Sequence, residues 1–174
     1  MSTRRIAKIS ISAGLLNGLK VALAFVPNVE LVSAILVVYA LTYQKMDSIL
    51  ISVLFVCLEI LIYGFALYWV VLYLIYWPLL TIVVGLLPRN KNVSIVIAIA
   101  IGMIATVFFG VLSSFVEVAM SNALGKEYFW KMVYFRYLAG IPFFVVHIVS
   151  NAIVLPLTVY PMCKILQKLD KSAM

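Results

Sequence analysis

Residues 48–87 read SILISVLFVCLEILIYGFALYWVVLYLIYWPLLTIVVGLL, and they decide the fold because Glu59 is the only charged residue among them. A helix that crosses a bilayer needs roughly 20 predominantly apolar residues, so this stretch is long enough for two. Gly64 lies between the two halves and is the best turn position, since glycine adopts backbone angles that other residues avoid. We therefore expect two membrane spans here, over residues 48–65 and 68–87.

The rest of the chain has the same character. Of its 174 residues, 66% are hydrophobic and 11% are charged, against about 45–50% and about a quarter in soluble domains. This excess of apolar residues excludes a soluble enzyme. Breaks in the apolar sequence predict four further spans, over residues 6–26, 29–43, 93–120 and 139–162. We expect an all-α polytopic membrane protein, with residues 1–174 forming one six-transmembrane-helix bundle.

The positive charges predict the orientation. The net charge of +7 would suit nucleic acid if it were gathered on one soluble face, but here the charges lie between apolar runs. Six spans place both termini on one side, with nine basic residues against three in the opposite loops, and the more basic side is cytoplasmic. The nine are Arg4, Arg5, Lys8, Lys45, Arg89, Lys91, Lys164, Lys168 and Lys171, and the three are Lys126, Lys131 and Arg136. We expect both termini in the cytoplasm and no nucleic-acid partner.

Residues 121–137 separate the last two expected spans and mix polar with aromatic side chains. In this topology they face the outside. We expect them to be the only loop long enough to form a structure of its own.

Small residues recur at every fourth position in two of the expected helices. Such a row lies along one helix face and allows close helix–helix approach in lipid. The first row is Ser10, Gly14, Gly18 and Ala22, and the second is Ala98, Gly102, Thr106, Gly110 and Ser114. Either row can pack within the bundle or contact a partner, and the first is the better partner candidate because terminal helices are often peripheral.

An aromatic stripe marks the span over residues 68–87. Trp69, Tyr73, Tyr76 and Trp77 share one helix face. Trp77 lies about 12 Å deeper than Trp69 at 1.5 Å per residue, which is too deep for both to belong to one headgroup belt. The stripe can line a pocket for a flat ligand or belong to an ordinary core, and both interpretations stay open.

Ionisable residues inside the spans are functional candidates by default. Lys20, Glu59 and Glu117 fall in the outer halves of their spans, and His147 and Asn151 share a face of the last one. Their convergence suggests a water-filled cavity open to the outside. The alternative is internal pairing, such as Lys20 with a carboxylate, which would still leave space for a cavity beside it.

Several catalytic patterns are missing from the sequence. The chain has no G-x-x-x-x-G-K-[ST] phosphate loop, no H-E-x-x-H and no G-x-S-x-G, and it contains one histidine. We therefore expect no catalytic residues, no metal and no cofactor.

The order of several short motifs resembles the substrate-binding S components of energy-coupling factor (ECF) vitamin transporters. These motifs are KVALA from Lys20, FVPNVELV from Phe25, IYGF from Ile62, YW from Tyr68, YWP from Tyr76, and YLAGIPF from Tyr137 followed by His147 and Asn151. Together they cover essentially the whole chain.

The resemblance implies a bacterial cytoplasmic membrane protein that binds a vitamin on the outer side. It also implies docking to a membrane-embedded T component carrying two ATPases, and delivery by reorientation of the whole subunit in the bilayer. The docking face would be Ser10, Gly14 and Gly18, where the family has alanines. The subgroup looks closest to cobalamin-type components, and pyridoxine, pantothenate or thiamin are the smaller alternatives.

The expected ligand contacts combine two residues of the first outer loop, the aromatic stripe, and polar residues near the outer side. They are Asn28, Glu30, Trp69, Tyr73, Trp77, Lys131, His147 and Asn151. The alternative from another functional class is a membrane scaffold subunit resembling MreD, which binds proteins and no vitamin.

Overall fold

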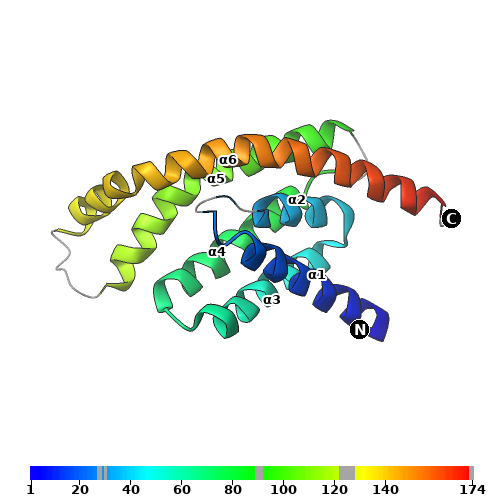
Figure 1. Cartoon of the computed structure of the whole chain (residues 1–174), viewed down its shortest axis with the longest axis horizontal. Helices are drawn as coiled ribbons and strands as arrows, with labels where there is room; N and C mark the ends of the chain where they lie inside the picture. The colour runs from blue at the N-terminus through cyan, green and yellow to red at the C-terminus, as the bar shows by residue number, and fades with distance from the viewer. Residues whose placement is uncertain (27–28, 30, 89–91, 122–127, 173–174) are drawn as a thin grey trace.

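The computed structural model describes residues 1–26, 29, 31–88, 92–121 and 128–172, and all regular structure within these ranges is helical (Figure 1). The expected all-α fold is thus confirmed for these residues. The elements are α1 (Thr3–Ala22), α2 (Val32–Thr42), α3 (Lys45–Tyr63), α4 (Leu67–Val84), α5 (Asn92–Met120) and α6 (Phe129–Ser172).

Among the described residues, four stretches of helix are long and apolar enough to cross a bilayer: Lys45–Tyr63, Leu67–Val84, Asn92–Met120 and Phe129–Leu166. This is the make-up of a helical membrane protein. The other two helices differ from them. α1 has 20 residues but carries four basic side chains, and α2 has 11 residues, about 16 Å at 1.5 Å per residue.

α2 is the centre of the molecule. Its residues from Val32 to Leu41 are all buried, and α2 packs against each of the five other helices. A helix that is apolar all round is one surrounded by protein or lipid, and for α2 the surroundings are protein. Its high hydropathy therefore reflects core packing.

The turn expected at Gly64 is confirmed. α3 ends at Tyr63, and Gly64 has a φ of +80°, in the region that side chains with a Cβ rarely adopt. Its N–H donates to the carbonyl of Ile60 at 3.0 Å, closing the last turn of α3. Three residues later α4 begins, and the two helices pack together.

The expected outer loop over residues 121–137 is wrong in its second half, because α6 already begins at Phe129. The last helix therefore begins ten residues before the expected span start at 139. Aromatic packing stabilises this extension, since Phe115 of α5 contacts Phe129 and Trp130 with ring centroids 5.5 and 6.1 Å apart. Arg136 adds an ion pair to Glu117 at 3.1 Å.

α5 and α6 form a long antiparallel pair, with α1 to α4 gathered along one side of it (Figure 1). The small-residue row of α5 is buried in this bundle. A Cβ on Gly102 would lie 3.1 Å from the Leu155 side chain, and one on Gly110 would lie 2.8 Å from Phe144. Glycine at these positions therefore lets α5 and α6 pack closely.

The row on α1 faces the other way. Ser10, Gly14, Gly18 and Ala22 are all exposed, and a Cβ on either glycine would meet nothing within 4 Å. Of the two rows, the one on α5 is used inside the bundle and the one on α1 has no neighbour among the described residues.

Basic helix ends gather at one end of the molecule. Arg5 Nε and Lys8 Nζ of α1 each lie 2.6 Å from a carboxylate oxygen of Asp47, near the start of α3. Lys164 of α6 donates to Asn92 at the start of α5. The start of α1 and the end of α6 lie towards this end, on the right in Figure 1.

Candidate functional site

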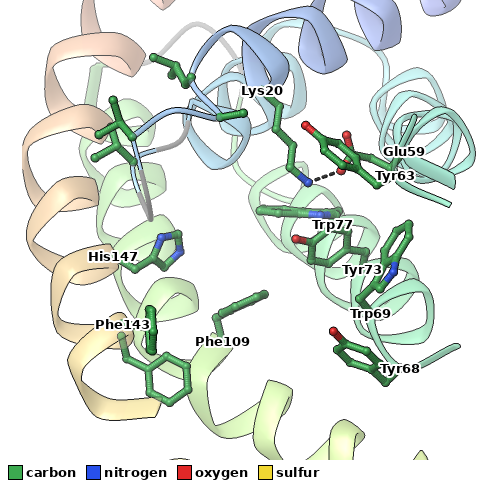
Figure 2. A pocket seen from close by; sticks show the side chains of 15 residues that line it. Lys20, Glu59, Tyr63, Tyr68, Trp69, Tyr73, Trp77, Phe109, Phe143 and His147 are labelled. Carbon is green, nitrogen blue, oxygen red and sulfur yellow. Dashed lines mark hydrogen bonds and ion pairs between the residues drawn. The ribbon is translucent and has the colours of Figure 1, made fainter. Parts of the chain in front are cut away.

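A cavity of about 480 Å³ lies between α1, α3 and α4 on one side and α5 and α6 on the other (Figure 2). Within the described residues α6 packs against neither α1 nor α4, and the cavity occupies the space between them. Its volume is typical of small-molecule sites. It is lined by Lys20, Leu23, Ala24, Val26, Val29, Glu59, Tyr63, Tyr68, Trp69, Tyr73, Trp77, Phe109, Phe143, Phe144 and His147.

The aromatic stripe of α4 forms one wall. Trp69, Tyr73 and Trp77 are spaced four residues apart, and successive rings make edge-to-face contacts with centroids 5.6 and 5.8 Å apart. Tyr76 is buried and is not a lining residue, and its ring packs against Phe109 with centroids 4.9 Å apart. The stripe therefore divides, with three rings at the cavity and the fourth in the core.

A buried ion pair lies beside this wall. Lys20 of α1 donates to Glu59 of α3, and the Glu59 side chain is only 1% exposed. The Lys20 ammonium also lies 4.8 Å from the ring centroid of Tyr73 and 5.4 Å from that of Tyr63. Lys20 thus joins three helices, because its charge is balanced by α3 and its ammonium rests on an aromatic ring of α4.

The pairing alternative for Lys20 is therefore correct, and a cavity lies beside the pair as well. Glu117 does not join the group, because its ion pair with Arg136 involves neither of the cavity's charged side chains, and it is not among the lining residues.

His147 forms the polar part of the opposite wall, next to Phe109, whose ring centroid lies 5.7 Å from the imidazole (Figure 2). A chain of hydrogen bonds links the imidazole to side chains that do not line the cavity. The Thr106 hydroxyl donates to the carbonyl of Gly102 at 2.9 Å and so accepts from Asn151 Nδ2, also at 2.9 Å. Asn151 Nδ2 lies 3.5 Å from His147 Nε2.

With the Asn151 amide in this orientation, the 3.5 Å contact favours one tautomer of His147. The Asn151 amide nitrogen is a donor only, so the facing Nε2 acts as the acceptor. In the neutral imidazole the proton then lies on Nδ1. Asn151 therefore acts behind the cavity wall, where it is fully buried, by orienting the imidazole.

Phe144 reaches the cavity because two glycines leave space for its ring. A Cβ on Gly140 would lie 2.4 Å from the Phe144 ring, and one on Gly110 would lie 2.8 Å from it. The ring is also stacked on Tyr137, with centroids 5.6 Å apart. An alanine at either glycine would push Phe144 from its present position.

The structure brings together some of the expected ligand contacts. Those that line the cavity are Trp69, Tyr73, Trp77 and His147. Asn151 lies one layer behind His147. Lys131 is exposed on α6 and does not line the cavity. Asn28 and Glu30 lie outside the described residues.

Sequence reasoning missed further lining residues. Lys20 and Glu59 were functional candidates as intramembrane charges but were not among the expected ligand contacts. Their opposite charges were the signal that the two side chains form a pair. The aromatic residues are Tyr63, Tyr68, Phe109, Phe143 and Phe144. Phe109 belongs to α5, and Phe143 and Phe144 belong to α6. No local sequence pattern indicates which aromatic residues of different helices lie close together.

The remaining ionisable groups do not suggest a metal site, since no cluster of three or more His, Cys, Asp or Glu side chains in the described ranges could hold an ion. No protein-family model, curated protein or solved structure matches the chain, so its site is interpreted from its own residues.

Proposed function

We propose that the chain is the substrate-binding subunit of an ECF-type vitamin transporter in a bacterial cytoplasmic membrane, working with a T component and two ATPases. The observation that carries the proposal is the cavity, where an aromatic wall, a buried ion pair and a histidine converge from four different helices. Charges inside a membrane bundle are expensive and are typical of substrate sites. The motif order that resembles S components supports the same function.

Six membrane crossings with both termini in the cytoplasm are part of this proposal. α1 and α3 begin at the same end, where Arg5 meets Asp47, and α1 ends beside the cavity, where Lys20 meets Glu59. The chain must therefore return through α2 before α3 begins. The nine-to-three distribution of basic residues supports a cytoplasmic location for the shared end of the helices.

The free face of α1 supports docking to another membrane subunit. Its small residues are exposed and bordered by exposed Ile11 and Leu15. In lipid, such faces associate through close backbone packing. This matches the role that the resemblance gives to Ser10, Gly14 and Gly18.

A small vitamin suits the cavity better than cobalamin does. A volume of about 480 Å³ lies in the range of sites that enclose drug-sized ligands. A corrinoid is too bulky for such a space and would have to rest against the outer loops. The cavity therefore favours a pyridoxine-, pantothenate- or thiamin-sized ligand.

Co-purification tests the proposal. The tagged chain, expressed with its native host's membrane proteins and extracted in detergent, should bring down a T component and two ATPases in stoichiometric amounts. Mass spectrometry of the same preparation should detect a bound vitamin. An empty protein that binds no vitamin by calorimetry and instead brings down cell-shape proteins would identify the scaffold alternative.

A further inference from the structure

The charge and shape of the cavity restrict the kind of molecule that it can hold, and this inference rests on the proposed function. Aromatic side chains line both walls, with Trp69, Tyr73 and Trp77 on α4 facing Phe109 of α5 and Phe143 of α6 (Figure 2). Aromatic rings on opposite walls favour a planar ligand, because flat molecules stack on or edge against them.

The places where a cation would bind are already occupied by the chain itself. An organic cation is recognised by aromatic faces and by carboxylates. Here the faces of Tyr73 and Tyr63 carry the Lys20 ammonium at 4.8 and 5.4 Å, and the Glu59 carboxylate is paired with the same ammonium. A permanently cationic ring would meet a like charge there and no unpaired carboxylate.

Lys20 instead offers hydrogen-bond donors to the ligand. Its ammonium has three N–H groups, its side chain is 23% exposed, and it lies on the cavity lining. An acceptor on a ligand, such as a ring nitrogen, hydroxyl oxygen or carboxylate, can bond to it without breaking the pair with Glu59. Since Lys20 and Glu59 cancel each other's charge, a neutral ligand leaves the cavity neutral.

We infer that the cavity takes a planar heteroaromatic molecule of one or two rings, neutral or singly anionic, that accepts a hydrogen bond from Lys20. The Lys20 ammonium disfavours permanently cationic rings. Within the vitamins considered above, the pyridoxine type fits this description. Thiamin carries a permanent positive charge, pantothenate is not planar, and cobalamin is too large for the cavity.

Matched pairs of small molecules test the inference directly. The purified 174-residue chain in detergent is titrated by calorimetry with pyridoxine and nicotinamide, and with the ring-N-methylated cation of each. Thiamin, pantothenate and cobalamin complete the series. At least one neutral ring should bind, and its methylated cation should bind about tenfold more weakly or worse, since a lost charged-group hydrogen bond has roughly that effect.

Substitution of Lys20 should reverse the preference. In Lys20→Met no ammonium repels a cation from the Glu59 carboxylate and the ring of Tyr73, so thiamin should gain affinity by about tenfold while the neutral ring loses a similar factor. The double variant Lys20→Met/Glu59→Gln removes both charges, keeps the packing, and should bind neither cation nor neutral ring tightly. Lys164→Met, at the far end of α6, is the matched lysine control.

Each outcome is decisive. If thiamin, pantothenate, cobalamin or a methylated cation is the tightest ligand of the unaltered chain, the inferred ligand class is wrong and the proposed transport function still stands. If no compound binds and no small molecule co-purifies, the proposed function fails and this inference falls with it. A co-purified molecule outside the series is judged by the same criteria of planarity and charge.

Discussion

At the scale of single residues, the histidine of the cavity depends on partners that lie outside the lining. His147 is oriented by Asn151, and Asn151 by the Thr106 hydroxyl. Thr106 belongs to the small-residue row of α5, so one position serves both close helix packing and the orientation of the imidazole. Such chains of buried polar groups stabilise a fold only when each member keeps its bond.

Thr106→Val should therefore lower the free energy of unfolding by about 1–3 kcal/mol, because the buried Asn151 amide loses its acceptor. Thr106→Ser keeps the hydroxyl and should behave nearly as the unaltered chain does. Thermal unfolding in detergent measures both. Nitrogen NMR of labelled histidine should show the proton on Nδ1 in the unaltered chain and a mixture of tautomers in Thr106→Val. Equal stability of the two variants would contradict the proposed chain of bonds.

The ion pair between Lys20 and Glu59 predicts that a second substitution rescues the first. Lys20→Met leaves a carboxylate that is 1% exposed without its cation, and breaking a buried pair in this way costs about 3–5 kcal/mol. Lys20→Met/Glu59→Gln should recover most of that loss. Chemical unfolding in mixed micelles gives the three free energies, and a double variant as unstable as the single one would show that the pair is not coupled.

At the scale of helices, the same four-residue pattern has two different uses. On α5 the row is buried against α6, and on α1 it is exposed. The sequence pattern identifies both faces but leaves their use open, because the difference is made by the neighbours, and α1 has none on that side among the described residues.

One leucine substitution in each row distinguishes packing within the bundle from docking to a partner. Gly102→Leu should destabilise the chain by about 1–3 kcal/mol through overpacking against Leu155, as measured by its unfolding midpoint. Gly14→Leu should leave the midpoint unchanged, since nothing lies within 4 Å of a Cβ there, and should abolish co-purification with a T component. A Gly14→Leu chain that still assembles and supports uptake would show that this face is not the docking surface.

At the scale of the whole molecule, the orientation of the basic end is a separate prediction. A green fluorescent protein fused after residue 174 should fluoresce, whereas alkaline phosphatase at the same position should be inactive, because it needs disulfides that form only outside the cytoplasm. Phosphatase inserted after Gly64, at the α3–α4 turn, should be active. The reverse pattern would invert the proposed topology.

Much of the fold could be predicted from apolar runs and their breaks, including the turn at Gly64 and helices close to all six expected spans. The early start of α6 could not, because the contacts of Phe129 and Trp130 with Phe115 are tertiary. The position of α2 in the protein core could not be predicted either, since lipid and a protein core both select apolar residues. For the site, the stripe on α4 could be predicted because its aromatic residues recur every four positions. The opposite wall could not, because its residues come from two helices that only the three-dimensional packing brings together.

α1 is tied to α3 near both of its ends, by Arg5 and Lys8 on Asp47 and by Lys20 on Glu59. These ion pairs fix α1 against α3 as one unit. The outer face of α1 is exposed, and Lys20 on its inner side lines the cavity. In the proposed function, a displacement of α1 by the T component would move the ammonium that the inferred ligand contacts. Since such coupling is reciprocal, the proposed partner would bind the filled and the empty subunit with different affinities, and loading of the cavity would be sensed at the opposite face of α1.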